Sequence, residues 1–134
     1  MDVSQEYVKM CDEAEEIQRR HHPNPYIDGW FPNGIIVPRI GRGGDAVWAL
    51  TCEGYVWLPR QDQLQGMVKT TSIEDLMLDF ISFTSRHLDN PFTDYARKFT
   101  SMEQLWLAYV MRRKFDKVWS GNRWVLTKAE AEIL

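Results

Sequence analysis

Two kinds of hydrophobic periodicity alternate along the chain, and their order limits the folds that it can adopt. Apolar residues recur at three- and four-residue steps near the N-terminus and over most of residues 71–114, as in helices with one buried face. Residues 35–58 instead carry short apolar runs of strand length. We therefore predict an α+β fold in a single globular domain, 1–134: a small antiparallel sheet, built from a meander and a C-terminal hairpin, packed against several helices.

The helices are expected where the three- to four-residue period coincides with capping residues. Their predicted ranges, in chain order, are Ser4–Arg20, Leu64–Val68, Thr71–His87, Asn90–Phe99 and Ser101–Lys114. The first of these gives the fold an N-terminal helix. In the third, the apolar face expected to pack on the core consists of Ile73, Leu76, Met77, Phe80 and Ile81.

The strands are expected where short apolar runs are bounded by turn residues. Three runs, Ile35–Ile40, Ala46–Leu50 and Tyr55–Leu58, are separated by spacers of hairpin length and predict an antiparallel meander. Near the C-terminus, Lys117–Trp119 and Arg123–Leu126 flank a Ser-Gly-Asn turn and predict a hairpin. A two-stranded hairpin is marginal alone, so it must pack on the helices or extend the meander.

The composition favours an ordinary globular chain of the reducing cytoplasm. The chain is rich in tryptophan, with six, which can supply much of the buried apolar area. Cys11 and Cys52 are its two cysteines, too few for a disulfide framework and without a CxxC pair, so we expect free thiols. The N-terminal stretch is acidic and amphipathic, and no apolar run reaches membrane-spanning length, so no membrane association is expected.

Aromatic and polar residues in two loops form the leading candidate for a ligand site. Trp30 and Phe31 lie in a loop dense in proline, glycine and asparagine, where rings close the core or present a binding surface. Arg60, Gln61 and Asp62 follow a predicted buried strand, and the arginine could hold an anionic or planar group with its guanidinium fork. The alternative is that these polar residues cap and solvate a helix start.

A basic cluster near the C-terminus raises a second possibility, nucleic-acid binding. The cluster consists of Arg112, Arg113, Lys114, Lys117 and Arg123, with tryptophans nearby for stacking. A net charge of −3 and the absence of a known binding motif argue against it. The cations can equally pair with the acidic first helix, within one chain or across a homodimer.

An enzyme is the remaining class, and the residues offer little for it. A small hydrolase would use a loop carboxylate, Glu53 or Asp62, near Cys52, but sequence does not give their separations. Neither cysteine lies in a recognisable nucleophile motif. We therefore favour a non-catalytic binding or accessory protein that acts through protein or small-molecule contacts.

No cofactor or metal is expected. His21, His22 and Asp28, with a distant Cys52 or His87, include residue types that bind zinc but lack its tight paired spacing. The loop Gly41–Asp45 superficially resembles a phosphate-binding loop, yet it lacks the lysine and the following helix of a P-loop, so a hairpin turn explains it better. An anion nest assisted by Arg42 is the alternative.

Overall fold

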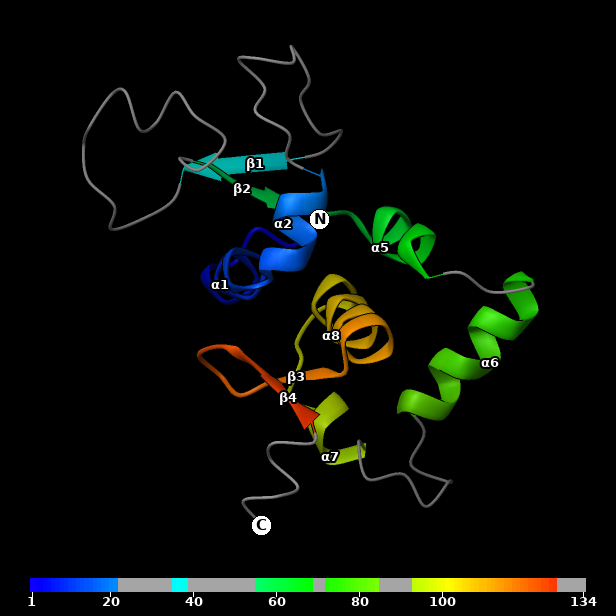
Figure 1. The fold of residues 1–134 in the computed structure, drawn as a ribbon. Helices are drawn as coiled ribbons and strands as arrows, with labels where there is room; N and C mark the ends of the chain where they lie inside the picture. Colours follow the sequence, from blue (N-terminus) through cyan, green and yellow to red (C-terminus); the bar gives the residue numbers. More distant parts are fainter. Residues whose placement is uncertain (22–34, 39–54, 69–71, 85–92, 128–134) are drawn as a thin grey trace.

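A computed structural model describes residues 1–21, 35–38, 55–68, 72–84 and 93–127 (Figure 1). The helices are α1 (Gln5–Glu13), α2 (Glu15–His21), α5 (Gln61–Met67), α6 (Ile73–Thr84), α7 (Thr93–Ala96) and α8 (Met102–Phe115). The strands are β1 (Ile35–Pro38), β2 (Tyr55–Leu58), β3 (Lys117–Trp119) and β4 (Trp124–Leu126). The predicted α+β class with an N-terminal helix is confirmed.

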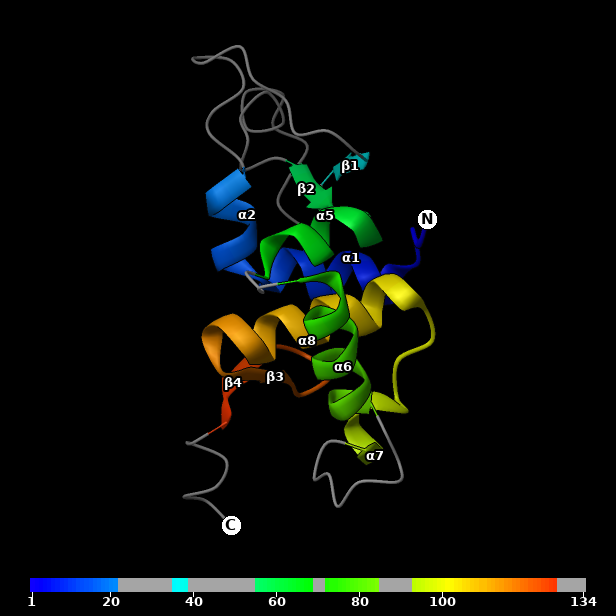
Figure 2. The same cartoon turned by 90° about the vertical axis from the view of Figure 1, so that its right-hand side faces the viewer.

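Helix α8 is the centre of the fold. It begins as predicted at Ser101, whose Oγ accepts a hydrogen bond from the backbone N–H of Gln104 at 3.1 Å. The six residues from Trp106 to Met111 are all buried, so every face of the helix is covered in this stretch. Figure 2 shows α8 with α1 and α5 on one side and the β3–β4 hairpin on the other.

The predicted long first helix is in fact two helices. The expectation of one helix over Ser4–Arg20 is wrong because α1 ends before Ala14, whose ψ of 71° leaves the helical region. The backbone N–H of Ala14 then bonds to the carbonyl of Cys11 at 3.1 Å. No proline or glycine marks this break in the sequence, so a tertiary contact sets it.

That contact is made by the buried side chain of Gln18 on α2. Its Nε2 donates to the carbonyls of Cys11, at 3.1 Å, and Trp57, at 2.8 Å. Its Oε1 accepts from the backbone N–H of Trp57 at 3.0 Å. The Gln18 amide therefore bonds to both the N–H and the carbonyl of Trp57, as the backbone of a neighbouring strand would. The turn at Ala14 orients α2 so that Gln18 reaches β2.

The two predicted β regions form separate two-stranded sheets. β1 pairs directly with β2, from Ile35 opposite Leu58 to Pro38 opposite Tyr55. The first and third runs of the expected meander are thus direct neighbours. A simple meander would instead place the middle run, Ala46–Leu50, between them. That middle run lies outside the described residues. The hairpin β3–β4 is present as predicted, with Val118 opposite Val125, and packs on the helices.

The hairpin is tied to α1 by two tryptophan side chains. Trp124 Nε1 donates to the carbonyl of Met10 at 2.9 Å, and Trp119 Nε1 donates to Glu6 Oε1 at 3.0 Å. The turn between the strands uses Gly121 at φ 105°, a conformation that glycine adopts without strain. Two strands that would be marginal in isolation are therefore held by indole hydrogen bonds to a helix.

We predict that Gln18→Leu lowers the free energy of unfolding by about 3 kcal/mol, because three hydrogen bonds in the interior are lost while the side-chain volume is nearly kept. Chemical denaturation monitored by circular dichroism measures this change. Gln65→Leu is the matched control, because Gln65 is half-buried on α5 and its side chain makes no hydrogen bond to any residue that the structure describes. Equal effects of the two substitutions would contradict the role assigned to Gln18.

Candidate functional site

The most unusual surface of the described structure is the outer face of α6. Ile73, Met77, Leu78 and Ile81 on this face are 81%, 45%, 58% and 50% exposed, respectively. Ile73, Met77 and Ile81 follow one another at four-residue steps, so they line one ridge of the helix, with Leu78 beside it. We call these four residues the α6 apolar surface. In Figure 1, α6 lies at the right-hand edge of the molecule, and no other labelled element lies outside it.

The opposite side of α6 is fixed to α8 by aromatic rings. Phe80 stacks on Trp106 with ring centroids 3.8 Å apart and an angle of 3° between the rings. Phe83 contacts the Tyr109 ring at 5.5 Å and the Tyr95 ring at 6.3 Å, both edge to face. These contacts hold the helix in one orientation, so the α6 apolar surface is presented by a rigid support.

A polar contact reinforces the same junction. The hydroxyl of Tyr109 donates to Asp79 Oδ2, and Arg113 Nε lies 3.3 Å from the same oxygen. Burial, followed by the hydrogen bond and the negative charge of Asp79, raises the pKa of Tyr109. Tyr109 therefore stays protonated and remains a hydrogen-bond donor at neutral pH.

The sequence prediction for this helix is partly wrong. Ile73, Met77 and Ile81 were expected to face the core, whereas the structure buries Phe80 and Phe83 and half-buries Leu76. The helix also begins from Ser72, whose Oγ accepts from the Asp75 backbone N–H at 3.1 Å, and not from the predicted Thr71, which lies outside the described residues.

A signal for this outcome was present in the amino-acid pattern. The apolar residues of α6 extend more than halfway around the helix, whereas one buried face needs a stripe of about 100°. The apolar residues outside that stripe have to face either a second neighbouring element or solvent. Sequence alone does not decide between the two, and the structure leaves it exposed.

The predicted ligand-binding residues Arg60, Gln61 and Asp62 lie together at the start of α5. Arg60 binds Asp62 through two hydrogen bonds, Nε to Oδ1 at 3.0 Å and a terminal nitrogen to Oδ2 at 3.3 Å. This pair lowers the pKa of the Asp62 carboxyl, chiefly through the hydrogen bond from Arg60. The guanidinium fork of Arg60 is thus engaged by a carboxylate of the same chain.

Trp30 and Phe31, the aromatic half of that candidate site, lie outside the described residues. A ligand-binding role for the two loops together therefore stays a prediction. Arg60 and Asp62 are both well exposed, so a ligand that binds this arginine would have to displace a neighbouring carboxylate.

The basic cluster proposed for nucleic acid is largely paired with carboxylates of the same chain. Arg112 forms an ion pair with Asp116 and Arg113 one with Asp79, while Lys117 binds Glu16 on α2. Lys114 lies 5.9 Å from the centre of the Phe115 ring, and Arg123 is exposed in the hairpin turn. The sequence left open whether the basic cluster pairs with the acidic N-terminal helical region of the same chain. The contact between Lys117 and Glu16 is such an intramolecular pair.

The residues considered for chemistry are mostly outside the described part of the chain. Cys52, Glu53 and the loop Gly41–Asp45, predicted to be a hairpin turn, fall there, as do His22, Asp28 and His87. Within the described ranges no three histidine, cysteine, aspartate or glutamate side chains are grouped closely enough to hold a metal ion. Also within those ranges, no helix is both long and apolar enough to cross a bilayer.

Comparison with known proteins adds no further assignment. No family model, curated protein or solved structure matches this chain.

Cys11 is a core residue with a suppressed thiol. Its side chain is fully buried on α1, and this burial raises the pKa of the thiol well above its ordinary value. The thiolate is the reactive form, so a buried neutral thiol does not act as a nucleophile. Cys11 therefore stabilises the core by packing.

We expect Cys11 to resist alkylation in the folded protein. In a Cys52→Ser variant, iodoacetamide at pH 8 should leave the intact mass unchanged, because burial both excludes the reagent and keeps the thiol protonated. Addition of denaturant should allow one alkylation. Rapid labelling without denaturant would show that Cys11 is accessible, contrary to its position in the structure.

Proposed function

We propose that this chain is a non-catalytic binding or accessory protein that inserts the α6 apolar surface into an apolar groove of a partner protein. The observation that carries the proposal is the exposure of Ile73, Met77, Leu78 and Ile81 on one helix. Contiguous exposed apolar residues mark interaction sites more often than isolated ones do. The ridge of apolar residues at four-residue steps suits the mode in which a helix lies in a groove.

The strength of such an interaction follows from the area available. Burying these partly exposed side chains would contribute roughly 1 kcal/mol each, or about 4 kcal/mol in all. Association itself costs about 4–15 kcal/mol, so these residues alone do not give a stable complex. The partner must therefore also contact the surroundings of α6, and the rigid support from Phe80 and Phe83 lowers the entropy that binding loses.

Charge on α6 indicates the chemistry of the groove. The exposed residues Glu74 and Asp75 lie in its first turn, and the helix contains no lysine or arginine. Negative charge there also stabilises the helix N-terminus. A groove with an apolar floor and lysine or arginine on its rim complements this surface, and electrostatic attraction would speed association and fix the register.

We propose the cytoplasm as the compartment, because Cys11 is a free thiol in the core, as expected for a protein of a reducing environment.

Site-specific photo-crosslinking in cells tests the proposal. With p-benzoylphenylalanine in place of Leu78, we expect one discrete adduct whose crosslinked partner peptide is apolar and flanked by lysine or arginine. The same probe in place of Met102, which is 47% exposed on α8, should not give this adduct. An identical adduct pattern from both positions, or none from Leu78, would overturn the proposal.

Charge reversal provides the second prediction for this surface. Glu74→Lys should reduce the Leu78 adduct several-fold, because the introduced cation faces the basic rim of the groove. Glu13→Lys makes the same change at an exposed position of α1 and should leave the adduct unchanged. Both substitutions are on the surface, and the favourable charge lost at the N-terminus of α6 is worth only about 0.3–1 kcal/mol, so both variants should remain folded at the assay temperature. Equal adduct yields from the two variants would contradict a basic rim.

A further inference from the structure

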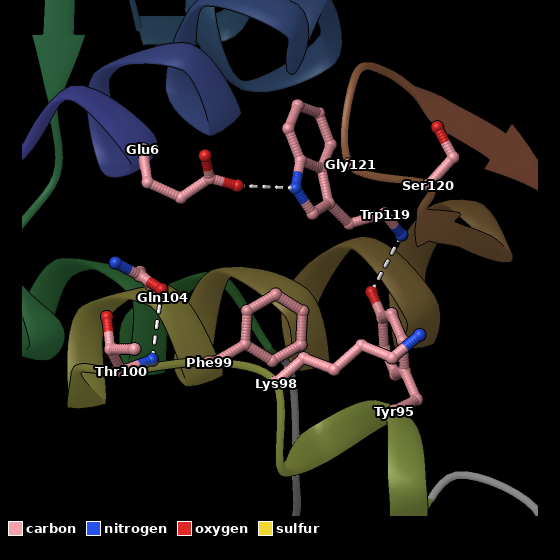
Figure 3. Close-up of a pocket in the computed structure, with 9 residues that line it drawn as sticks. All are labelled: Glu6, Tyr95, Lys98, Phe99, Thr100, Gln104, Trp119, Ser120 and Gly121. Carbon is pink, nitrogen blue, oxygen red and sulfur yellow. Dashed lines mark hydrogen bonds between the residues drawn. The ribbon is translucent and has the colours of Figure 1, made fainter.

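A pocket of about 290 Å³ lies where α1, α7, the start of α8 and the β3–β4 turn meet (Figure 3). It shares no residue with the α6 apolar surface. Pockets for small molecules are commonly roughly 300–1,000 Å³, so this one is at the lower limit. It can take a molecule about the size of a single amino acid.

Three aromatic rings form much of the pocket wall. Tyr95 and Phe99 meet edge to face, with centroids 5.0 Å apart and an angle of 90° between the rings. Trp119 is held against them because its backbone N–H donates to the Tyr95 hydroxyl oxygen at 2.7 Å. Trp119 is buried and its ring contacts Trp124 at 5.1 Å, so the wall is part of the packed hairpin.

One acidic and one basic side chain complete the wall. Figure 3 shows Glu6 entering from the α1 side and Lys98 from the α7 side, with the Lys98 amine drawn beside the Tyr95 ring. One carboxylate oxygen of Glu6 accepts from Trp119 Nε1 at 3.0 Å. Within the described ranges, no hydrogen bond reaches its other oxygen and no carboxylate pairs with Lys98, so both charges are available to a ligand.

The position of the two charges selects the class of ligand. A purely cationic molecule would be attracted by Glu6 but repelled by Lys98. A purely anionic molecule would be attracted by Lys98 but repelled by Glu6. A molecule with an amine at one end and a carboxylate at the other satisfies both, while a flat apolar spacer lies against the rings. We propose that this pocket binds a small zwitterion with its amine and carboxylate at opposite ends of a short apolar spacer.

The indole N–H of Trp119 is a local reporter for the test. It donates directly to Glu6, so its NMR resonance responds to a ligand that reaches this carboxylate. The indole N–H of Trp124 donates to the buried carbonyl of Met10 and serves as an internal control in the same spectrum. The probe is 4-(aminomethyl)benzoate, and its singly charged analogues are benzylamine and 4-methylbenzoate.

We expect the zwitterion to shift the Trp119 indole signal, and not that of Trp124, with a Kd up to about fivefold below that of either analogue, which is the upper end of the effect of one exposed ion pair. Glu6→Gln keeps an oxygen acceptor for Trp119 and removes only the charge, so it should weaken the zwitterion and benzylamine about fivefold while sparing 4-methylbenzoate. Lys98→Gln should weaken the zwitterion and 4-methylbenzoate instead.

Three results would each overturn the inference. The zwitterion could fail to shift Trp119 up to its solubility, could bind no more tightly than both analogues, or could keep its Kd in both variants. None of these results would affect the adduct from Leu78, so the pocket and the α6 apolar surface are tested separately.

Discussion

The burial of α8 on every side is the constraint on which the rest of the structure depends. Six consecutive residues, Trp106 to Met111, are removed from water, and a helix covered all round needs neighbours in every direction. Helices α1, α5 and α6 and the β3–β4 hairpin supply them (Figures 1 and 2). Each of these elements is short, and two-stranded sheets are marginal alone, so they become stable by packing around α8.

The same arrangement explains why α6 has two different faces. Phe80 and Phe83 occupy the space that α8 and α7 leave open, with Phe80 stacked on Trp106 at 3.8 Å. Once these rings are in place, the ridge that begins at Ile73 faces outward, because residues four apart share one face of a helix. The α6 apolar surface is therefore exposed because the hydrophobic core ends at Phe80 and Phe83. We propose that the groove of a partner protein covers this surface.

Charge is mostly balanced within the chain. The ion pairs of Arg112, Arg113 and Lys117 engage three of the five cations once considered for nucleic acid. Such partly exposed pairs contribute little stability, typically up to about 1 kcal/mol each, but they lower the basic potential that a phosphate backbone would meet. Glu6 and Lys98 differ because they line a pocket from opposite sides, and this arrangement supports the proposed zwitterion.

The sequence by itself determined the class of the fold and the position of several elements, because periodicity and capping are local. The Ser101 cap of α8 and the hairpin β3–β4 were predicted, and so was a short helix at α5, although α5 begins three residues before the predicted Leu64. Only the tertiary structure decided the break at Ala14, the direct pairing of β1 with β2, and which half of α6 is buried. These features depend on residues far apart in the chain, such as the Gln18 amide on β2. The pocket wall likewise joins residues more than 100 positions apart, since Glu6 meets Trp119, and local patterns do not record which distant segments meet.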